Sequence, residues 1–145
     1  MDQLFKLLRK FSSVIIGIII GGFVTFFIER LGHENISAYQ DVPNMIEKDA
    51  FADFISNLPV IAFLILLLAH SVGTMVSGGF ATLFSGESRP VAATAVGAIM
   101  LGLGFVNFIA IPSHPVWFMI CEAIIYLPSA LIGHSLFLKI KGVLT

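Results

Sequence analysis

The stretch from residue 90 to residue 138 contains a single charged residue, Glu122, in 49 positions. As one helix it would be about 73 Å long, more than twice the roughly 30 Å of bilayer hydrocarbon. The stretch must therefore fold back on itself. We predict the break in the Pro-Ser-His-Pro segment at 112–115, because proline lacks a backbone N–H and disfavours helix at the residue before it. The two expected membrane spans are about 90–111 and 116–138.

Two further uncharged stretches precede this one. Residues 11–28 contain no Asp, Glu, Lys or Arg and would form a helix about 27 Å long. Basic residues come before this stretch, as in a signal peptide, but its apolar run is longer than a signal-peptide core and no small-residue cleavage site follows. We therefore expect a membrane span here. Residues 54–86 also lack these charged residues, and Pro59 with a following glycine pair favours a span at about 58–80.

The composition agrees with a membrane protein. Hydrophobic residues make up 57% of the chain and charged residues 12%, and the mean hydropathy is +0.98. The net charge of -1 provides no field that would attract nucleic acid, so we expect no nucleic-acid partner. The predicted fold class is all-α: a polytopic membrane protein whose single transmembrane domain, residues 1–145, is a bundle of four transmembrane helices in the lipid bilayer.

Basic residues are divided unevenly between the two ends of this predicted bundle. Two of them, Arg30 and Lys48, lie in the loop at 29–57. The other six lie at the opposite end, and these are Lys6, Arg9, Lys10, Arg89, Lys139 and Lys141. The positive-inside rule then predicts that both termini are cytoplasmic and that the loop at 29–57 is outside.

This outer loop is rich in acidic residues and has a helical signature. Its acidic residues are Glu29, Glu34, Asp41, Glu47, Asp49 and Asp53. The Asn-Met-Ile-Glu segment at 44–47 resembles a capping box, which predicts a short helix beginning there. Its apolar side would lie on the membrane surface and consist of Met45, Ile46, Phe51, Phe54 and Ile55. The alternative is a solvated loop without a helix.

Small residues recur in every predicted span at spacings that let helices approach closely. They are Gly17 and Gly21 in the first span, Gly73 and Ser77 in the second, Gly97 and Gly102 in the third, and Ser129 and Gly133 in the fourth. One interpretation is helix packing within a single bundle. The other is self-association of two copies, for which the Gly-x-x-x-Gly pattern at 17–21 is the leading candidate.

Four polar side chains interrupt the apolar spans: His70, Asn107, Glu122 and Tyr126. Measured along helices from the outer surface, Asn107 lies about 7 Å deep, Glu122 about 10 Å, and His70 and Tyr126 about 16 Å. Glu122 and Tyr126 share the small-residue face of their helix, and His70 shares that of its own, so these side chains should meet inside the bundle.

Two interpretations of this polar group remain open. In the first it is a proton or cation path, in which Glu122 exchanges a proton, His70 donates and accepts, Tyr126 relays and Asn107 forms the entrance. In the second it is a buried hydrogen-bond network that fixes the helix register. We expect His134 to lie outside this group, near the cytoplasmic headgroups.

No cofactor and no metal site is predicted. His70, His114 and His134 lie at three different depths, which argues against a haem held by two histidines. The sequence contains no signature of a zinc hydrolase, a thiol oxidoreductase, a nucleotide-binding loop or a common serine esterase.

Three segments stand out in the last three spans. They are His70-x-x-Gly73 followed by Gly78-Gly79, Ile111-Pro112-x-His114-Pro115-x-Trp117-Phe118, and Leu127-Pro128-x-Ala130-x-x-Gly133. In these segments the chain resembles small four-helix proteins of bacterial inner membranes for which no activity is established. The resemblance covers about the last three spans and implies a bacterial inner-membrane protein without implying a substrate.

Three functional classes follow from the sequence. The first is a transporter or channel subunit linked to protons or cations, which would act as an oligomer because four helices leave little room for a path. The second is a structural or accessory subunit that packs against other membrane proteins. The third is an intramembrane enzyme, for which the sequence offers no catalytic residues.

The orientation can be tested by cysteine accessibility in intact cells. With Cys121→Ala as background, Ser37→Cys should react with an impermeant thiol reagent added outside, and Ser88→Cys should not, because the basic residues place residue 88 in the cytoplasm. Labelling of residue 88 but not residue 37 would reverse the orientation.

Overall fold

The computed structural model describes residues 2–39, 42–44, 46–111 and 113–144. Within these residues the chain is helical apart from its connecting segments. The elements are α1 (Asp2–Asn35), the short 3-10 helix η1 (Ser37–Tyr39), α2 (Lys48–Ser56), α3 (Val60–Ser85), α4 (Val91–Ala110) and α5 (Val116–Leu144). The long helices α1, α3, α4 and α5 are each long and apolar enough to cross a membrane, so the predicted all-α class with four such helices is confirmed.

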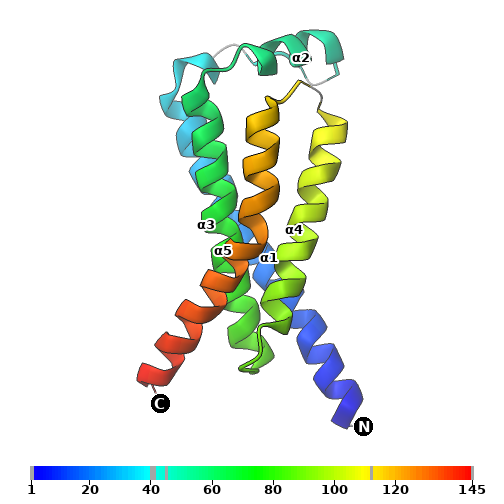
Figure 1. Cartoon of the computed structure of the whole chain (residues 1–145), viewed down its shortest axis with the longest axis vertical. Helices are drawn as coiled ribbons and strands as arrows, with labels where there is room; N and C mark the ends of the chain where they lie inside the picture. Colours follow the sequence, from blue (N-terminus) through cyan, green and yellow to red (C-terminus); the bar gives the residue numbers. More distant parts are fainter. Residues whose placement is uncertain (1, 40–41, 45, 112, 145) are drawn as a thin grey trace.

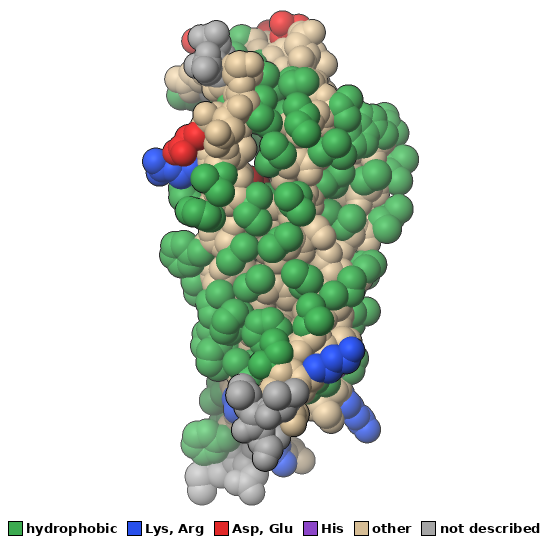
Figure 2. Space-filling model, turned by 90° about the vertical axis from the view of Figure 1, so that its left-hand side faces the viewer, with side chains coloured by type: hydrophobic (Ala, Val, Ile, Leu, Met, Phe, Trp, Pro, Cys, Tyr) green, Lys and Arg blue, Asp and Glu red, His purple; other side chains and the backbone are tan. Residues whose placement is uncertain are grey.

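The four long helices pack side by side, with both termini and the turn between α3 and α4 at one end and α2 across the other end (Figure 1). On the face shown in Figure 2, apolar side chains cover most of the surface between these ends, and basic side chains lie mainly near the end that carries the termini. The polypeptide turns between α4 and α5 in the predicted segment, where Ser113 adopts a left-handed backbone with φ 78°. Pro112 lies outside the described residues.

Helix α1 is longer than the span predicted at 11–28. Residues 29–35, which we expected to be loop, continue the helix. The first charged residues end the apolar stretch but not the helix, and Arg30 and Glu34 form an exposed ion pair one turn apart at 2.8 Å on this extension. The Asn35 side chain also donates to the Leu31 carbonyl at 2.7 Å. This extension brings Glu29 alongside the other helices.

The predicted capping box at 44–47 is wrong. Helix α2 begins at Lys48, and Glu47 occupies the N-cap position without a side-chain hydrogen bond. The Asn44 side chain instead accepts a hydrogen bond from the Ile46 N–H at 3.1 Å, a local turn that competes with helix. Met45 lies outside the described residues.

The apolar side of α2 packs on the ends of the long helices. Phe51, Phe54 and the buried Ile55 join a cluster that includes Phe63 of α3 and Phe118 of α5. Ile46 is not part of this side, since it precedes the helix and is 84% exposed. Helix α2 therefore closes the end of the molecule with aromatic side chains.

Glycine contacts hold α1 against α3. A Cβ atom on Gly17 would lie 2.5 Å from the Ser77 carbonyl oxygen, and one on Gly21 would overlap the Ser77 hydroxyl and the Gly73 carbonyl. The face that carries Gly17 and Gly21 is therefore covered within one chain. The prediction that a second copy binds this face is wrong, and the packing interpretation accounts for it.

Most of the other predicted packing residues also lie in helix contacts. Gly97 faces Leu127, and Gly133 faces the Met75 backbone. Ser129 exchanges a hydrogen bond with Ser71 at 3.0 Å. Gly102 differs, because a Cβ atom there would meet nothing within 4 Å, so this glycine makes no close helix contact with the described residues.

At the end that carries the termini, α1 is tied to the turn between α3 and α4. Lys10 pairs with Glu87 at 2.9 Å. Gly86 ends α3 with a left-handed backbone, φ 70°, and lies beside the Arg9 guanidinium.

Adjacent glycines in α1 give a matched test of this packing. Gly21→Ala should lower the free energy of unfolding by about 1–3 kcal/mol, because the added methyl group overlaps α3. Gly22→Ala should cause no loss, since a Cβ atom at Gly22 meets nothing within 4 Å. Thermal melting in one detergent would compare them, and equal melting temperatures would contradict the close contact.

Candidate functional site

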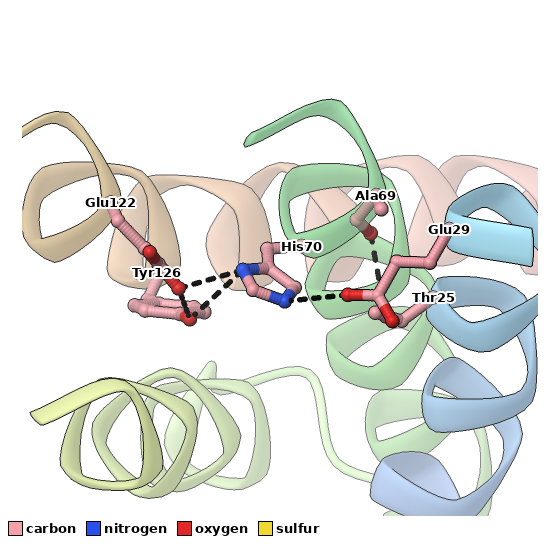
Figure 3. Close-up of polar contacts among 6 residues, drawn as sticks. All are labelled: Thr25, Glu29, Ala69, His70, Glu122 and Tyr126. Carbon is pink, nitrogen blue, oxygen red and sulfur yellow. Dashed lines mark hydrogen bonds and ion pairs between the residues drawn. The ribbon is translucent and has the colours of Figure 1, made fainter. Parts of the chain in front are cut away.

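The His70 ring lies between two carboxyl groups from different helices. Its Nδ1 atom is 2.7 Å from Glu122 Oε1 on α5, and its Nε2 atom is 3.1 Å from Glu29 Oε1 on α1. Figure 3 shows the ring of His70, on α3, between these two acids. The three side chains thus form a continuous carboxyl–imidazole–carboxyl array across α1, α3 and α5, which we call the acid–histidine array.

The geometry of this array fixes a minimum number of protons. A hydrogen bond at each ring nitrogen needs one proton between each nitrogen and its carboxyl oxygen. The protons are either both on His70, as an imidazolium between two carboxylates, or one on His70 and one on a carboxyl group. Both contacts of His70 can be hydrogen bonds at the same time only when the array carries one proton more than a neutral imidazole flanked by two carboxylates.

Tyr126 completes the buried end of the array. Its hydroxyl donates to Glu122 Oε1 and lies 3.4 Å from His70 Nδ1. The second carboxyl oxygen, Glu122 Oε2, is buried and has no hydrogen-bond partner among the described residues. An unpartnered carboxyl oxygen in an apolar interior is costly, so this oxygen is available to a proton or to a ligand.

Exposure decreases along the array. The side chain of Glu29 is 29% exposed, that of His70 is 18% exposed and that of Glu122 is fully buried, at 0%. The array therefore runs from a partly exposed acid to a fully buried one.

A cavity of about 570 Å³ adjoins all four of these side chains. It lies between the long helices at the end opposite the termini, and η1 and α2 form its outer wall. Its walls are mostly apolar, with Asn107, His33, His114 and Tyr39 as further polar members. None of the described lining residues is Lys or Arg. The charged side chains on its wall are therefore acidic.

Tyr39, in η1, forms part of the outer wall of the cavity. Its ring stacks on that of His33, with the ring centres 4.1 Å apart. Burial raises the pKa of Tyr39 above its ordinary value, and the negative charge of Glu29 raises it further. The hydroxyl is therefore neutral at physiological pH, and it can donate or accept a hydrogen bond at the cavity wall.

The structure brings together three of the four predicted polar residues. His70, Glu122 and Tyr126 are in mutual contact, whereas Asn107 lines the cavity without a side-chain hydrogen bond to the described residues. The sequence analysis missed Glu29 because it ended the first helix at residue 28. A signal was present, since Glu29 continues the four-residue spacing of Gly17, Gly21 and Thr25.

The expected interfacial position of His134 is wrong. His134 is buried, and its Nδ1 atom lies 2.9 Å from the Thr82 hydroxyl on α3. Its hydrogen bond joins α3 and α5, as does that between Ser71 and Ser129.

No group of three or more His, Cys, Asp or Glu side chains in the described part of the chain has an arrangement that would hold a metal ion. Comparisons of the chain with models of protein families, with curated proteins and with solved structures find no match. Any functional conclusion therefore depends on the acid–histidine array and its cavity.

Replacing the central imidazole tests whether the array is a formed interaction. His70→Leu should lower the free energy of unfolding by about 1–3 kcal/mol, because Glu122 loses a buried partner. His33→Leu is the control, since His33 is exposed and stacks on Tyr39 without contacting the array. Melting curves at neutral pH would compare the two, and a His70→Leu protein as stable as the wild type would argue against the contact.

Proposed function

We propose that the chain is a four-helix transmembrane bundle of a bacterial inner membrane with both termini in the cytoplasm. The apolar surface between the two ends is what a bilayer requires, and the concentration of basic residues at the end with the termini supports the orientation. In this arrangement α2 lies at the outer interface and the cavity is on the outer side.

Within this membrane, we propose that the protein is a transporter or channel subunit linked to protons or cations. The observation that carries the proposal is the acid–histidine array, which leads from a partly exposed acid to a fully buried one. Ionisable residues inside membrane spans are costly, and those that face an interior cavity characterise proton and ion pathways.

The array has the chemistry of a proton relay. A proton that reaches Glu29 from the cavity can pass to His70 Nε2, and His70 can release its other proton from Nδ1 to Glu122. The Tyr126 hydroxyl, which already donates to Glu122, holds that carboxyl group beside the His70 ring. Each transfer follows a hydrogen bond that is already formed, so it needs no large movement of a side chain.

A proton or cation that reaches Glu122 must still cross the cytoplasmic half of the bundle, and the array does not extend there. Beyond the array, small buried side chains such as Ala81, Val96 and Ala130 pack closely. A pathway therefore requires this half to rearrange, or a homo-oligomer or another membrane subunit to complete it. An oligomer is consistent with the limited interior of four helices.

A structural or accessory subunit is the second candidate. The observation that favours it is the row of polar contacts that joins α3 and α5, in which His70 meets Glu122, Ser71 meets Ser129 and Thr82 meets His134. Such contacts fix the register of two helices whether or not a proton moves along them.

Proton flux in liposomes distinguishes these candidates. Glu122→Gln keeps the shape of the side chain but cannot exchange a proton, so it should reduce a protein-dependent proton or cation flux at least tenfold. Glu34→Gln is the matched control, because Glu34 is exposed, pairs with Arg30 and does not line the cavity. A pH-sensitive dye inside the liposomes reports the flux.

The structural candidate makes the opposite prediction. Wild-type protein would then show no flux above lipid alone, across a panel of cations and with a pH gradient. Glu122→Gln would remain folded, because glutamine still forms a hydrogen bond with His70. That combination would remove the transport proposal.

A further inference from the structure

The cavity is larger and more apolar than a proton pathway requires. Its volume of about 570 Å³ falls in the range of pockets that bind small organic molecules. We propose that it binds a small organic cation with an apolar body, whose charge lies against Glu122 and Glu29. This inference names the substrate class of the transport function proposed above and therefore rests on that function.

The charge of the ligand follows from the cavity wall. Glu29 and Glu122 both line it, and the described lining residues include no basic side chain apart from histidines. The acid–histidine array carries two carboxyl groups for one imidazole, so its full deprotonation leaves two negative charges. A cation complements this charge, whereas an anion would be repelled.

Glu122 provides an independent indication of a ligand. Its side chain is fully buried, it lines the cavity, and its Oε2 atom has no partner among the described residues. Its other oxygen is already occupied by His70 and Tyr126. His70 and Tyr126 therefore hold one oxygen in place, while the described residues leave the hydrogen-bonding capacity of the other unused.

The apolar body of the ligand follows from the aromatic walls. Six aromatic rings line the cavity, from α1, η1, α2 and α5, and these are Phe26, Tyr39, Phe51, Phe54, Phe118 and Tyr126. Aromatic faces attract organic cations, and they also contact the apolar part of such a ligand. A small inorganic cation would leave most of this surface without a partner.

The position of the opening agrees with a ligand that partitions into lipid. The exposed lining residues of the long helices belong to α1 and α4, and among them Phe26 is 61% and Leu103 is 53% exposed. The lining residues of α5 are buried. In Figure 1, α1 and α4 diverge toward the end that carries α2. The cavity therefore opens sideways between these two helices, where the apolar surface would meet the bilayer.

Protons and the cation should compete for the same carboxyl groups. Protonation of Glu122 removes the charge that attracts the ligand, so binding should weaken as the pH falls. Several titratable groups face Glu122 or the cavity and take part in this competition. They are Glu29 and His33 from α1, Tyr39 from η1, His70 from α3, His114 from the turn before α5, and Tyr126 from α5.

Phenyltrimethylammonium is a suitable probe, and tert-butylbenzene is its neutral control of the same shape. In lipid nanodiscs, calorimetric titration should show saturable binding of the cation to the wild type that weakens at low pH. Glu122→Gln should weaken this binding at least tenfold, and Glu34→Gln should leave it unchanged. The neutral analogue should bind at least tenfold more weakly than the cation and should not respond to Glu122→Gln.

A second variant covers the case in which Glu122→Gln does not fold. Leu103→Trp places a large side chain at the opening and retains both acids, so it should weaken binding of the cation at least fivefold. The inference is overturned if the cation shows no saturable binding, if the neutral analogue binds as well as the cation, or if a folded Glu122→Gln protein binds like the wild type.

The flux assay separates this inference from the function on which it rests. Proton flux that depends on Glu122, without binding of phenyltrimethylammonium, would contradict the proposed ligand and support the proposed proton pathway. Binding that depends on Glu122, without any flux in liposomes, would support the ligand site and overturn transport.

Discussion

The close approach of three helices through small side chains determines the rest of the structure. Gly21 and Gly73 bring the backbones of α1 and α3 together, and Gly133 brings α5 against the other side of α3. The imidazole of His70 is short, so it contacts carboxyl groups on both neighbouring helices only because the helices lie this close. Its Nδ1 atom is 2.7 Å from Glu122 and its Nε2 atom is 3.1 Å from Glu29. Larger residues at these glycines would separate the helices and leave ionisable groups unpaired in an apolar interior, which is costly. The pairing of the ionisable side chains in this protein therefore depends on the close packing of the glycines.

The sequence was sufficient to predict the long helices because their signal is local. Long uncharged stretches require spanning helices, and the length limit of a bilayer required the break between α4 and α5. The contact of His70 with Glu122 and Tyr126 also followed from helix periodicity, since each side chain shares a face with small residues. Gly17 and Gly21 were recognised as a contact face, but periodicity does not say whether the partner is the same chain or a second copy.

The features that the sequence analysis missed depend on where helices end and what covers them. Glu29 was assigned to a loop because charge marks the end of an apolar stretch, whereas the helix continues to Asn35 and Glu29 pairs with His70 of α3. His134 was placed at the membrane surface by its depth alone, but the Thr82 hydroxyl on α3 provides a buried partner. The start of α2 was misplaced because Asn44 forms its own local turn. In each case a specific hydrogen-bond or ion-pair partner outweighed a general preference.

Among the described residues, two ion pairs of different character join helix α1 to the rest of the protein. Lys10 and Glu87, at the end with the termini, form a pair whose side chains are 38% and 30% exposed. Dissolved salt screens such a pair. Glu29 and His70, whose side chains are 29% and 18% exposed, form the other pair beside the cavity. The pair at the end with the termini depends on the ionic strength of the solution, whereas the pair beside the cavity is an ion pair only when His70 is protonated, so α1 is held by two contacts that respond to different conditions.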